Sequence, residues 1–212
     1  MSNHRERNQR FDELFRRVQF TSKARYNAAR RLGRYHLFTQ ITPAFMSIGL
    51  VVIPLAKLLG FNRGYADNYV ELMQIVFAVM LLAYSLLLGM GNYSTRAEKA
   101  HRCGMTLGRL ARNIFPYRNV ADGSELNGIY EKMCNDYYEC LEKHENHKHV
   151  DYLVAQYDLL DAGDKFDFRV TAQRFGLWLN VVCRELFELS HFIFSLILLG
   201  AWIWYMMSQG VS

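Results

Sequence analysis

Apolar residues are concentrated in three long stretches of the chain that contain no Asp, Glu, Lys or Arg. The stretches cover residues 36–56, 72–95 and 189–212 and are 21, 24 and 24 residues long. Because an α-helix rises about 1.5 Å per residue, ~20 apolar residues cross the hydrocarbon core of a bilayer, which is about 30 Å thick. The pattern therefore predicts a two-helix transmembrane hairpin within residues 36–95 and a third apolar helix within residues 189–212.

The third stretch is open to more than one interpretation. Its apolar run ends in Trp202, Trp204 and Tyr205, which is the aromatic pattern of a membrane–water interface. This helix either crosses the bilayer, lies in the interface, or packs against the bundle without crossing. In the first stretch Pro43 and Pro54 interrupt the apolar run, but prolines are tolerated in membranes where neighbours satisfy the freed carbonyls.

The remaining sequence has helical periodicity and no sustained strand-like alternation. Residues 1–35 form an amphipathic, basic helix, and residues 96–115 form another that Pro116 stops. Ser124 caps a helix over residues 125–148, a further element starts near Val150, and a long helix runs from Lys165 into the last apolar stretch. We expect the helices at 96–115 and 165–189 to be continuous with the second and third apolar helices.

These elements predict an all-α integral membrane protein with two or three transmembrane helices. Four regions follow along the chain: the amphipathic helix (1–35), the transmembrane hairpin (36–95), a helical cytoplasmic domain (96–188) and the third apolar helix (189–212). A mean hydropathy of −0.08 suggests a soluble protein, but this average conceals the clustering. The content of charged residues, 21%, and of aromatic residues, 14%, excludes a disordered chain.

The net charge of +5 is distributed unevenly and predicts the orientation of the chain. Residues 1–35 carry +7, residues 57–71 carry 0, residues 96–118 carry +5 and residues 119–190 carry −7. Basic flanks remain on the cytoplasmic side of a membrane. We therefore expect a multi-pass protein of the bacterial inner membrane with its N-terminus in the cytoplasm.

The two basic regions beside the hairpin have two explanations. Their side chains either form a pocket for a phosphate-rich ligand or only fix the topology and contact anionic lipid headgroups. The candidate ligand-binding residues are Arg30, Arg31, Arg34, Arg96, His101, Arg102, Arg109 and Arg112.

Polar residues within the apolar stretches also have two explanations. Gln40 and Ser47 are seven residues apart, and Gln74 and Ser85 are eleven apart, so each pair lies on one helical face. These residues either line or gate a water-filled pore, or form hydrogen bonds between packed helices whose close approach Gly49, Gly89 and Gly91 permit. Three helices cannot enclose a useful aqueous channel, so a pore requires several copies of the chain.

No catalytic or metal-binding motif is recognisable. Cys103, Cys134, Cys140 and Cys183 have no zinc-ribbon or CxxC spacing and are expected to be reduced thiols. The run from His144 to His149 contains three histidines, and a solvated helix end is favoured over a metal site. We expect no enzymatic activity, no metal and no cofactor.

A set of short motifs surrounds the hairpin in a recognisable order. Tyr26 and Asn27 precede it, Tyr93, Ala97 and His101 follow it, and Asn146, His147 and Asp151 come later. This arrangement, over roughly residues 15–200, resembles the SLATT domain, a two-span effector domain of bacterial anti-phage nucleotide-signalling systems.

The resemblance implies a membrane effector that oligomerises and conducts ions or permeabilises the inner membrane, which stops the growth of infected cells in abortive infection. A separate SLATT chain with a third apolar helix is similar to the channel effector of Hailong-type systems. There a partner nucleotidyltransferase makes an oligodeoxyadenylate that holds the channel closed. The partners implied are further copies of the chain, in a tetramer, the lipid bilayer, a nucleotide or oligodeoxyadenylate, and small ions. The alternative is a membrane-anchored scaffold or receptor with a protein-binding cytoplasmic domain and no pore.

Overall fold

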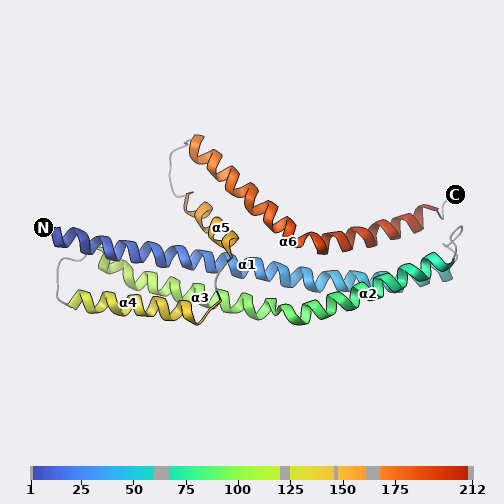
Figure 1. Ribbon diagram of the computed structural model, residues 1–212, viewed down its shortest axis with the longest axis horizontal. Helices are drawn as coiled ribbons and strands as arrows, with labels where there is room; N and C mark the ends of the chain where they lie inside the picture. The colour runs from blue at the N-terminus through green and yellow to red at the C-terminus, as the bar shows by residue number, and fades with distance from the viewer. Residues whose placement is uncertain (1, 60–66, 120–124, 146–147, 161–167, 210–212) are drawn as a thin grey trace. The chain divides into compact units, whose positions relative to one another are not determined.

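The computed structural model describes residues 2–59, 67–119, 125–145, 148–160 and 168–209, and within them all regular structure is helical (Figure 1). The all-α prediction is therefore confirmed for the described part of the chain. The elements are α1 (Ser2–Leu58), α2 (Asp67–Gly91), α3 (Tyr93–Ile114), a 3₁₀ turn η1 (Phe115–Asn119), α4 (Glu125–Glu142), α5 (His149–Leu160) and α6 (Phe168–Gln209).

Helix α1 includes both the amphipathic N-terminal segment and the first apolar stretch. It contains Pro43 and Pro54 without ending at either. The hydroxyl of Ser47 donates a hydrogen bond to the carbonyl of Pro43 at 2.8 Å. Helix α6 likewise includes the last apolar stretch together with the charged segment before it, as the sequence predicts. The start that the sequence predicts for this helix, Lys165, lies outside the described residues.

The expected continuity between the second apolar helix and the next helix is wrong. Helix α2 ends at Gly91, and Asn92 has a φ of 44° before α3 begins at Tyr93. This is the left-handed conformation that ends many helices, and asparagine tolerates it better than most side chains. The sequence Gly91-Asn92 is therefore a helix stop.

Helix α4 ends at Glu142, so it is shorter than the predicted helix over 125–148. The next helix, α5, has a local reason to begin at His149. The carboxylate of Asp151 accepts a hydrogen bond from the backbone N–H of Lys148 at 3.0 Å, which satisfies an unpaired donor at the helix start.

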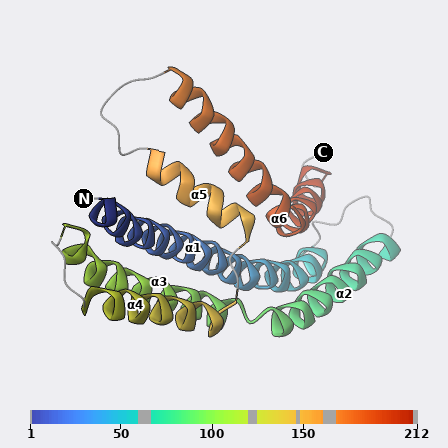
Figure 2. The same cartoon turned by 60° about the vertical axis from the view of Figure 1, so that its left-hand side comes forward.

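The chain divides into two compact units. We name Met1–Gly33 with Ser94–Arg184 the charged unit, and Arg34–Tyr93 with Glu185–Ser212 the apolar unit. In the charged unit α1, α3 and α4 run side by side (Figures 1 and 2). Their core contains Phe11, Leu14, Val18, Cys103, Leu107, Leu110, Ala111, Ile114, Met133, Tyr137 and Cys140.

The face that α3 buries in this core follows helical periodicity, from Ala100 to Ile114. Gly104 lies where α1 and α3 approach closely, since a Cβ there would be 3.3 Å from the ring of Tyr26. Its carbonyl accepts a hydrogen bond from the Ser22 hydroxyl at 2.8 Å. Small residues on α3 thus let the two helices pack tightly.

In the apolar unit, segments of α1 and α2 pack against the end of α6. A Cβ on Gly49 would lie 2.5 Å from Leu199 Cδ1, so glycine permits this approach of α1 to α6. The hydroxyls of Tyr84 and Ser195 are hydrogen-bonded at 2.6 Å and join α2 to α6. Phe192 stacks against Tyr84 and Phe38.

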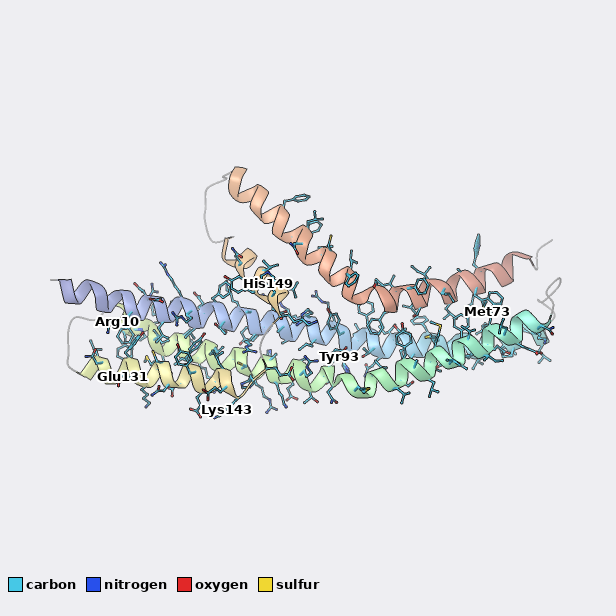
Figure 3. The ribbon with its side chains drawn as sticks, viewed as in Figure 1. Arg10, Met73, Tyr93, Glu131, Lys143 and His149 are labelled. Carbon is cyan, nitrogen blue, oxygen red and sulfur yellow. The ribbon has the colours of Figure 1, made fainter. Side chains whose placement is uncertain are left out.

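One described helix is long and apolar enough to cross a membrane, and its span lies within Arg10–Leu58. Two shorter apolar helical segments, Glu71–Leu86 and Phe192–Trp204, accompany it. Figure 3 shows the side chains along these helices. Many large apolar side chains of this unit are exposed, including Ile48, Val51, Leu82 and Leu86 at 56–67%.

Candidate ligand-binding site

The charged unit contains a cavity of about 100 Å³ with a strongly basic lining. We call it the basic pocket. Its walls come from α1, α3 and the segment between α4 and α5: Arg25, Ala28, Arg31, Leu32, Arg96, Lys99, Ala100, Lys143, His144, Glu145 and Lys148. Six of these residues are Lys or Arg, and Glu145 is the one carboxylate.

Arg25 is the most unusual residue of the basic pocket, because its side chain is almost completely buried, at 2% exposure. One guanidinium nitrogen, Nη1, donates to the backbone carbonyl of Glu145. Its Nε and Nη2 are buried and have no hydrogen-bond partner among the residues that the structure describes. Burying unsatisfied donors of a cation costs several kcal/mol, so this guanidinium favours an anion beside it.

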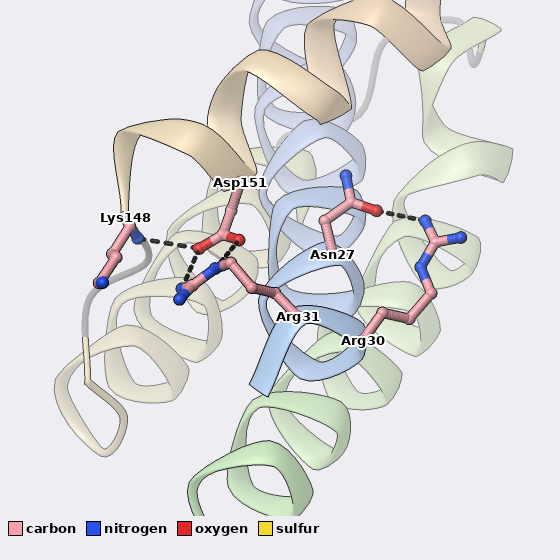
Figure 4. Close-up of polar contacts among 5 residues, drawn as sticks. All are labelled: Asn27, Arg30, Arg31, Lys148 and Asp151. Atoms are coloured by element: carbon pink, nitrogen blue, oxygen red, sulfur yellow. Dashed lines mark hydrogen bonds and ion pairs between the residues drawn. The ribbon is translucent and has the colours of Figure 1, made fainter. Parts of the chain in front are cut away.

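Arg31 is buried in the same unit and is paired with Asp151 on α5 (Figure 4). The Nε and Nη2 atoms of Arg31 each donate to one carboxylate oxygen at 2.9 Å, in a bidentate arrangement. Asp151 also accepts from the Lys148 backbone, so it holds α1 and the start of α5 together. The role of Arg31 in this unit is therefore structural as well as electrostatic.

The carboxylates near the basic pocket do not balance its positive charge. Arg96 pairs with Glu145 at 2.9 Å, and Arg31 pairs with Asp151. Lys143, which directly follows α4 (Figure 3), pairs with the exposed Glu139 at 2.5 Å, an interaction that raises the pKa of Lys143 and keeps it charged. Arg25 and Lys99 retain uncompensated charge among the described groups, which favours an anionic ligand.

Two of the eight predicted ligand-binding residues, Arg31 and Arg96, line the basic pocket. Arg30 is exposed and donates to the side-chain oxygen of Asn27 (Figure 4). Arg102 is exposed and pairs with Glu98 within α3. Arg34 belongs to the apolar unit, and Arg112 is exposed on α3.

The other two candidates have different surroundings. His101 is exposed and stands edge-on to the ring of Tyr26, with ring centroids 5.4 Å apart. Arg109 lines a second, more open cavity of about 440 Å³ between α3 and α4, which we call the α3–α4 groove. Lys143 and His144 line both cavities.

The residues that resemble the family motif are mostly structural in the charged unit. Tyr26 packs on Gly104 and His101, Asn27 is buried, and Asp151 pairs with Arg31. Tyr93 stands edge-on to Tyr35 in the apolar unit, with centroids 5.9 Å apart, and Ala97 is half-buried on α3. Asn146 and His147 lie outside the described residues.

The polar residues proposed for a pore differ from one another. The hydroxyls of Ser47 and Ser85 donate to carbonyls of their own helices, at 2.8 and 2.9 Å. Their polarity is thus already satisfied without a second helix. Gln40 is exposed on α1, and Gln74 is half-buried on α2.

Sequence reasoning missed Arg25, Lys99, Lys143, His144 and Lys148. Arg25 and Lys99 could have been found from helical spacing. Arg25 shares one face of α1 with Ala28 and Arg31, and Lys99 shares one face of α3 with Arg96 and Ala100. The contribution of the segment after α4 depends on a tertiary contact, the bond from Arg25 to Glu145.

The helices define an all-α membrane protein with a small basic cavity in its charged part. The chain belongs to the SMODS and SLOG-associating 2TM effector domain family 5, a SLATT family, which it matches over residues 7–206. The predicted SLATT relationship is therefore confirmed, and the protein is a membrane effector of the nucleotide-signalling anti-phage type. No curated protein and no solved structure matches the chain.

Proposed function

We propose that the protein is an oligomeric, ligand-gated ion channel of the bacterial inner membrane, controlled by a nucleotide or short oligonucleotide that binds at the basic pocket. The charged unit lies in the cytoplasm in this proposal, and infection changes the ligand level and opens the channel. The observation that carries the proposal is Arg25, a buried guanidinium with two unpartnered nitrogens in a cavity lined by five other basic side chains.

The size and charge of the basic pocket favour one phosphate group over a whole nucleotide. Pockets that enclose drug-sized ligands measure about 300–1,000 Å³, whereas this cavity measures about 100 Å³. A phosphate would accept hydrogen bonds from Arg25 while Lys99 and Lys143 contribute charge at the rim. The rest of the ligand would extend outside the cavity.

Helix α1 supplies a physical route from the ligand to the membrane in this proposal. It lines the basic pocket and contributes residues to both units without a described break. A ligand changes the open-to-closed ratio only if it binds the two states with different affinity. A difference of about 3 kcal/mol changes this ratio by more than 100-fold.

A Hailong-type system is the most specific version of the proposal. In it, a partner nucleotidyltransferase supplies an oligodeoxyadenylate that closes the channel. The apolar C-terminal part of α6, the third apolar helix, supports this version.

Binding of a fluorescent oligodeoxyadenylate trimer to the detergent-solubilised protein tests the ligand site. Replacing Arg25→Gln should weaken binding by roughly 10- to 150-fold, the equivalent of a charge-assisted hydrogen bond worth 1.5–3 kcal/mol. Lys99→Ala, at an exposed position that keeps the core intact, should weaken it by severalfold. The matched control is Lys132→Ala, an exposed lysine of α4 outside the basic pocket. Equal losses in all three variants would contradict the site.

Ion flux from liposomes that contain the purified protein tests the channel. We expect flux that depends on the oligodeoxyadenylate trimer, and altered conductance after Gln40→Leu or Gln74→Leu if these residues line the pore. No flux with or without the trimer would reject the channel and favour the membrane-anchored scaffold. Binding without flux would retain the ligand site and reject only the pore.

A further inference from the structure

Three potential metal ligands from two helices meet inside the charged unit. They are Cys103 of α3, Cys140 of α4 and His144, which follows α4 by two residues. One potential ligand atom from each residue lies within 4.8 Å of the others. Both cysteines are buried and His144 is half-buried. Nothing in the sequence spacing indicates the cluster, because Cys103 and Cys140 are 37 residues apart.

The distance between the two sulfur atoms is suitable for a tetrahedral metal ion. Cys103 Sγ and Cys140 Sγ are 3.6 Å apart. Two thiolates bound to zinc at about 2.3 Å with tetrahedral angles lie roughly 3.8 Å apart. The sulfur atoms thus need to move by only a few tenths of an ångström, and a small rotation of the imidazole completes a three-residue ligand set.

The orientation of His144 prepares it for this role. Its Nδ1 lies 2.8 Å from the backbone carbonyl oxygen of Cys140. A carbonyl oxygen only accepts, so Nδ1 carries the hydrogen and Nε2 of the neutral ring has a free lone pair. A hydrogen bond from the other ring nitrogen to a backbone carbonyl is the usual support of a metal-ligating histidine.

The charges are also consistent with a divalent cation. Two thiolates and one neutral imidazole neutralise Zn²⁺ without a carboxylate, and soft sulfur ligands favour zinc over magnesium or calcium. In the metal-free protein, burial and the neighbouring Cys140 raise the pKa of Cys103 to about 12. Arg25 acts in the opposite direction, because its positive charge stabilises the thiolate form of Cys103. Zinc binds cysteine as the thiolate, so binding displaces the proton of each coordinating thiol.

A path for the ion and room for a fourth ligand are present. Cys140 and His144 line the α3–α4 groove, which has a volume of about 440 Å³. Three protein ligands leave one tetrahedral position for water or another small ligand from this side.

We propose that Cys103, Cys140 and His144 bind one zinc ion, which ties α3 to the segment after α4. This site is independent of the proposed channel function, because it rests only on the three ligands. His144 and its neighbours Lys143 and Glu145 also line the basic pocket. Zinc would thereby fix one wall of that pocket.

Metal analysis of the full-length, tag-free protein in detergent, loaded with Zn²⁺ in reducing buffer and then desalted, tests the proposal. We expect one zinc per chain in the wild type. Cys103→Ser and Cys140→Ser should each weaken zinc binding by at least about 100-fold, since even outer-shell substitutions cost 10–100-fold. Cys134→Ser and Cys183→Ser are the matched controls for the cysteine variants and should retain one zinc. His144→Ala should also weaken zinc binding, and its matched control, His149→Ala, should not.

Cobalt substitution provides a second measurement that does not depend on any variant. Co²⁺ in the wild-type protein should give a thiolate-to-cobalt charge-transfer band and the intense visible bands of tetrahedral coordination. Absence of both bands and of bound zinc in the reduced wild-type protein would overturn the proposal, as would unchanged zinc binding in folded Cys103→Ser and Cys140→Ser variants. A Cys103–Cys140 disulfide that forms in air, with no metal bound after reduction, would also overturn it.

Discussion

Helices α2 and α3 are neighbours in the sequence but have opposite surfaces. On α3 the buried face is apolar, from Ala100 to Ile114, and the exposed face contains charged residues such as Arg102 and Arg112. On α2 large apolar side chains are exposed, including Leu82 at 62%, whereas the polar hydroxyl of Tyr84 is buried in a hydrogen bond. We propose that the solvent around each unit explains this inversion, with water around the charged unit and lipid, which is as apolar as leucine, around the apolar unit.

The two units also differ in the polar groups that they bury. The charged unit buries a whole ion pair, Arg31 with Asp151. The polar groups that the described part of the apolar unit buries are neutral, such as the hydroxyls of Thr39, Thr42, Tyr84 and Ser195. The following substitutions test this difference, in order of the expected loss of stability.

The largest effect should follow from Asp151→Asn, which leaves the buried Arg31 without its counter-charge. We expect the free energy of unfolding to fall by about 3–5 kcal/mol, measured by circular dichroism during chemical unfolding in detergent micelles. Replacing both residues by leucine should restore most of this loss, because no buried charge remains. A loss below about 1 kcal/mol for Asp151→Asn would show that the pair is solvated.

Leu107→Ala should have the next largest effect. Leu107 is 0% exposed in the core of the charged unit, so its truncation leaves a cavity and should cost about 2–5 kcal/mol. Leu82→Ala in the apolar unit is the matched control and should cost less than about 1 kcal/mol, because lipid or detergent replaces the lost side chain. Equal losses in the same unfolding measurement would contradict the assignment of two different solvents.

Tyr84→Phe should have a small effect, because hydrogen bonds between membrane helices contribute about 0.6 kcal/mol on average. The loss should appear as a small decrease in unfolding free energy. Ser85→Ala is the control at the adjacent residue, since the Ser85 hydroxyl donates to the Leu81 carbonyl of its own helix. A larger loss from Ser85→Ala than from Tyr84→Phe would place the interhelical contact elsewhere.

The ionisation of Cys103 should affect stability only in alkaline solution. Its pKa is raised from 9.0 to about 12 in the folded chain, so the unfolded chain releases this proton first. With a chelator present, stability should therefore fall as the pH rises from about 9 towards 12, and show no contribution from this group below 9. The difference in unfolding free energy between wild type and Cys103→Ala, compared at pH 7 and pH 10, measures it. An unchanged difference would mean that the thiol is exposed in the folded protein.

Patterns within one helix could be predicted from the sequence, because they depend on local periodicity. The apolar face of α3 and the uninterrupted α6 are examples. The end of α2 could also have been predicted, since Gly91-Asn92 is a helix-stop pair, but we interpreted Gly91 only as allowing close approach of helices.

Contacts between distant segments could not be predicted in this way. Arg31 was expected among ligand-binding residues, but its partner Asp151 is 120 positions away and becomes visible only in the folded chain. The same is true of the two sulfur atoms of Cys103 and Cys140. The basic pocket is partly predictable. Its faces on α1 and α3 follow helical periodicity, whereas its wall after α4 is formed by a contact between distant segments.

The separation of 120 residues between Arg31 and Asp151 also sets an order of events during synthesis. A ribosome that adds 5–20 residues per second needs roughly 6–24 s to reach Asp151 after Arg31 has been made. In that interval it completes the predicted transmembrane hairpin of residues 36–95. Arg31 is therefore made before its partner, and the two helices of the hairpin emerge in between. The charged unit can close only after both helices have reached the insertion machinery.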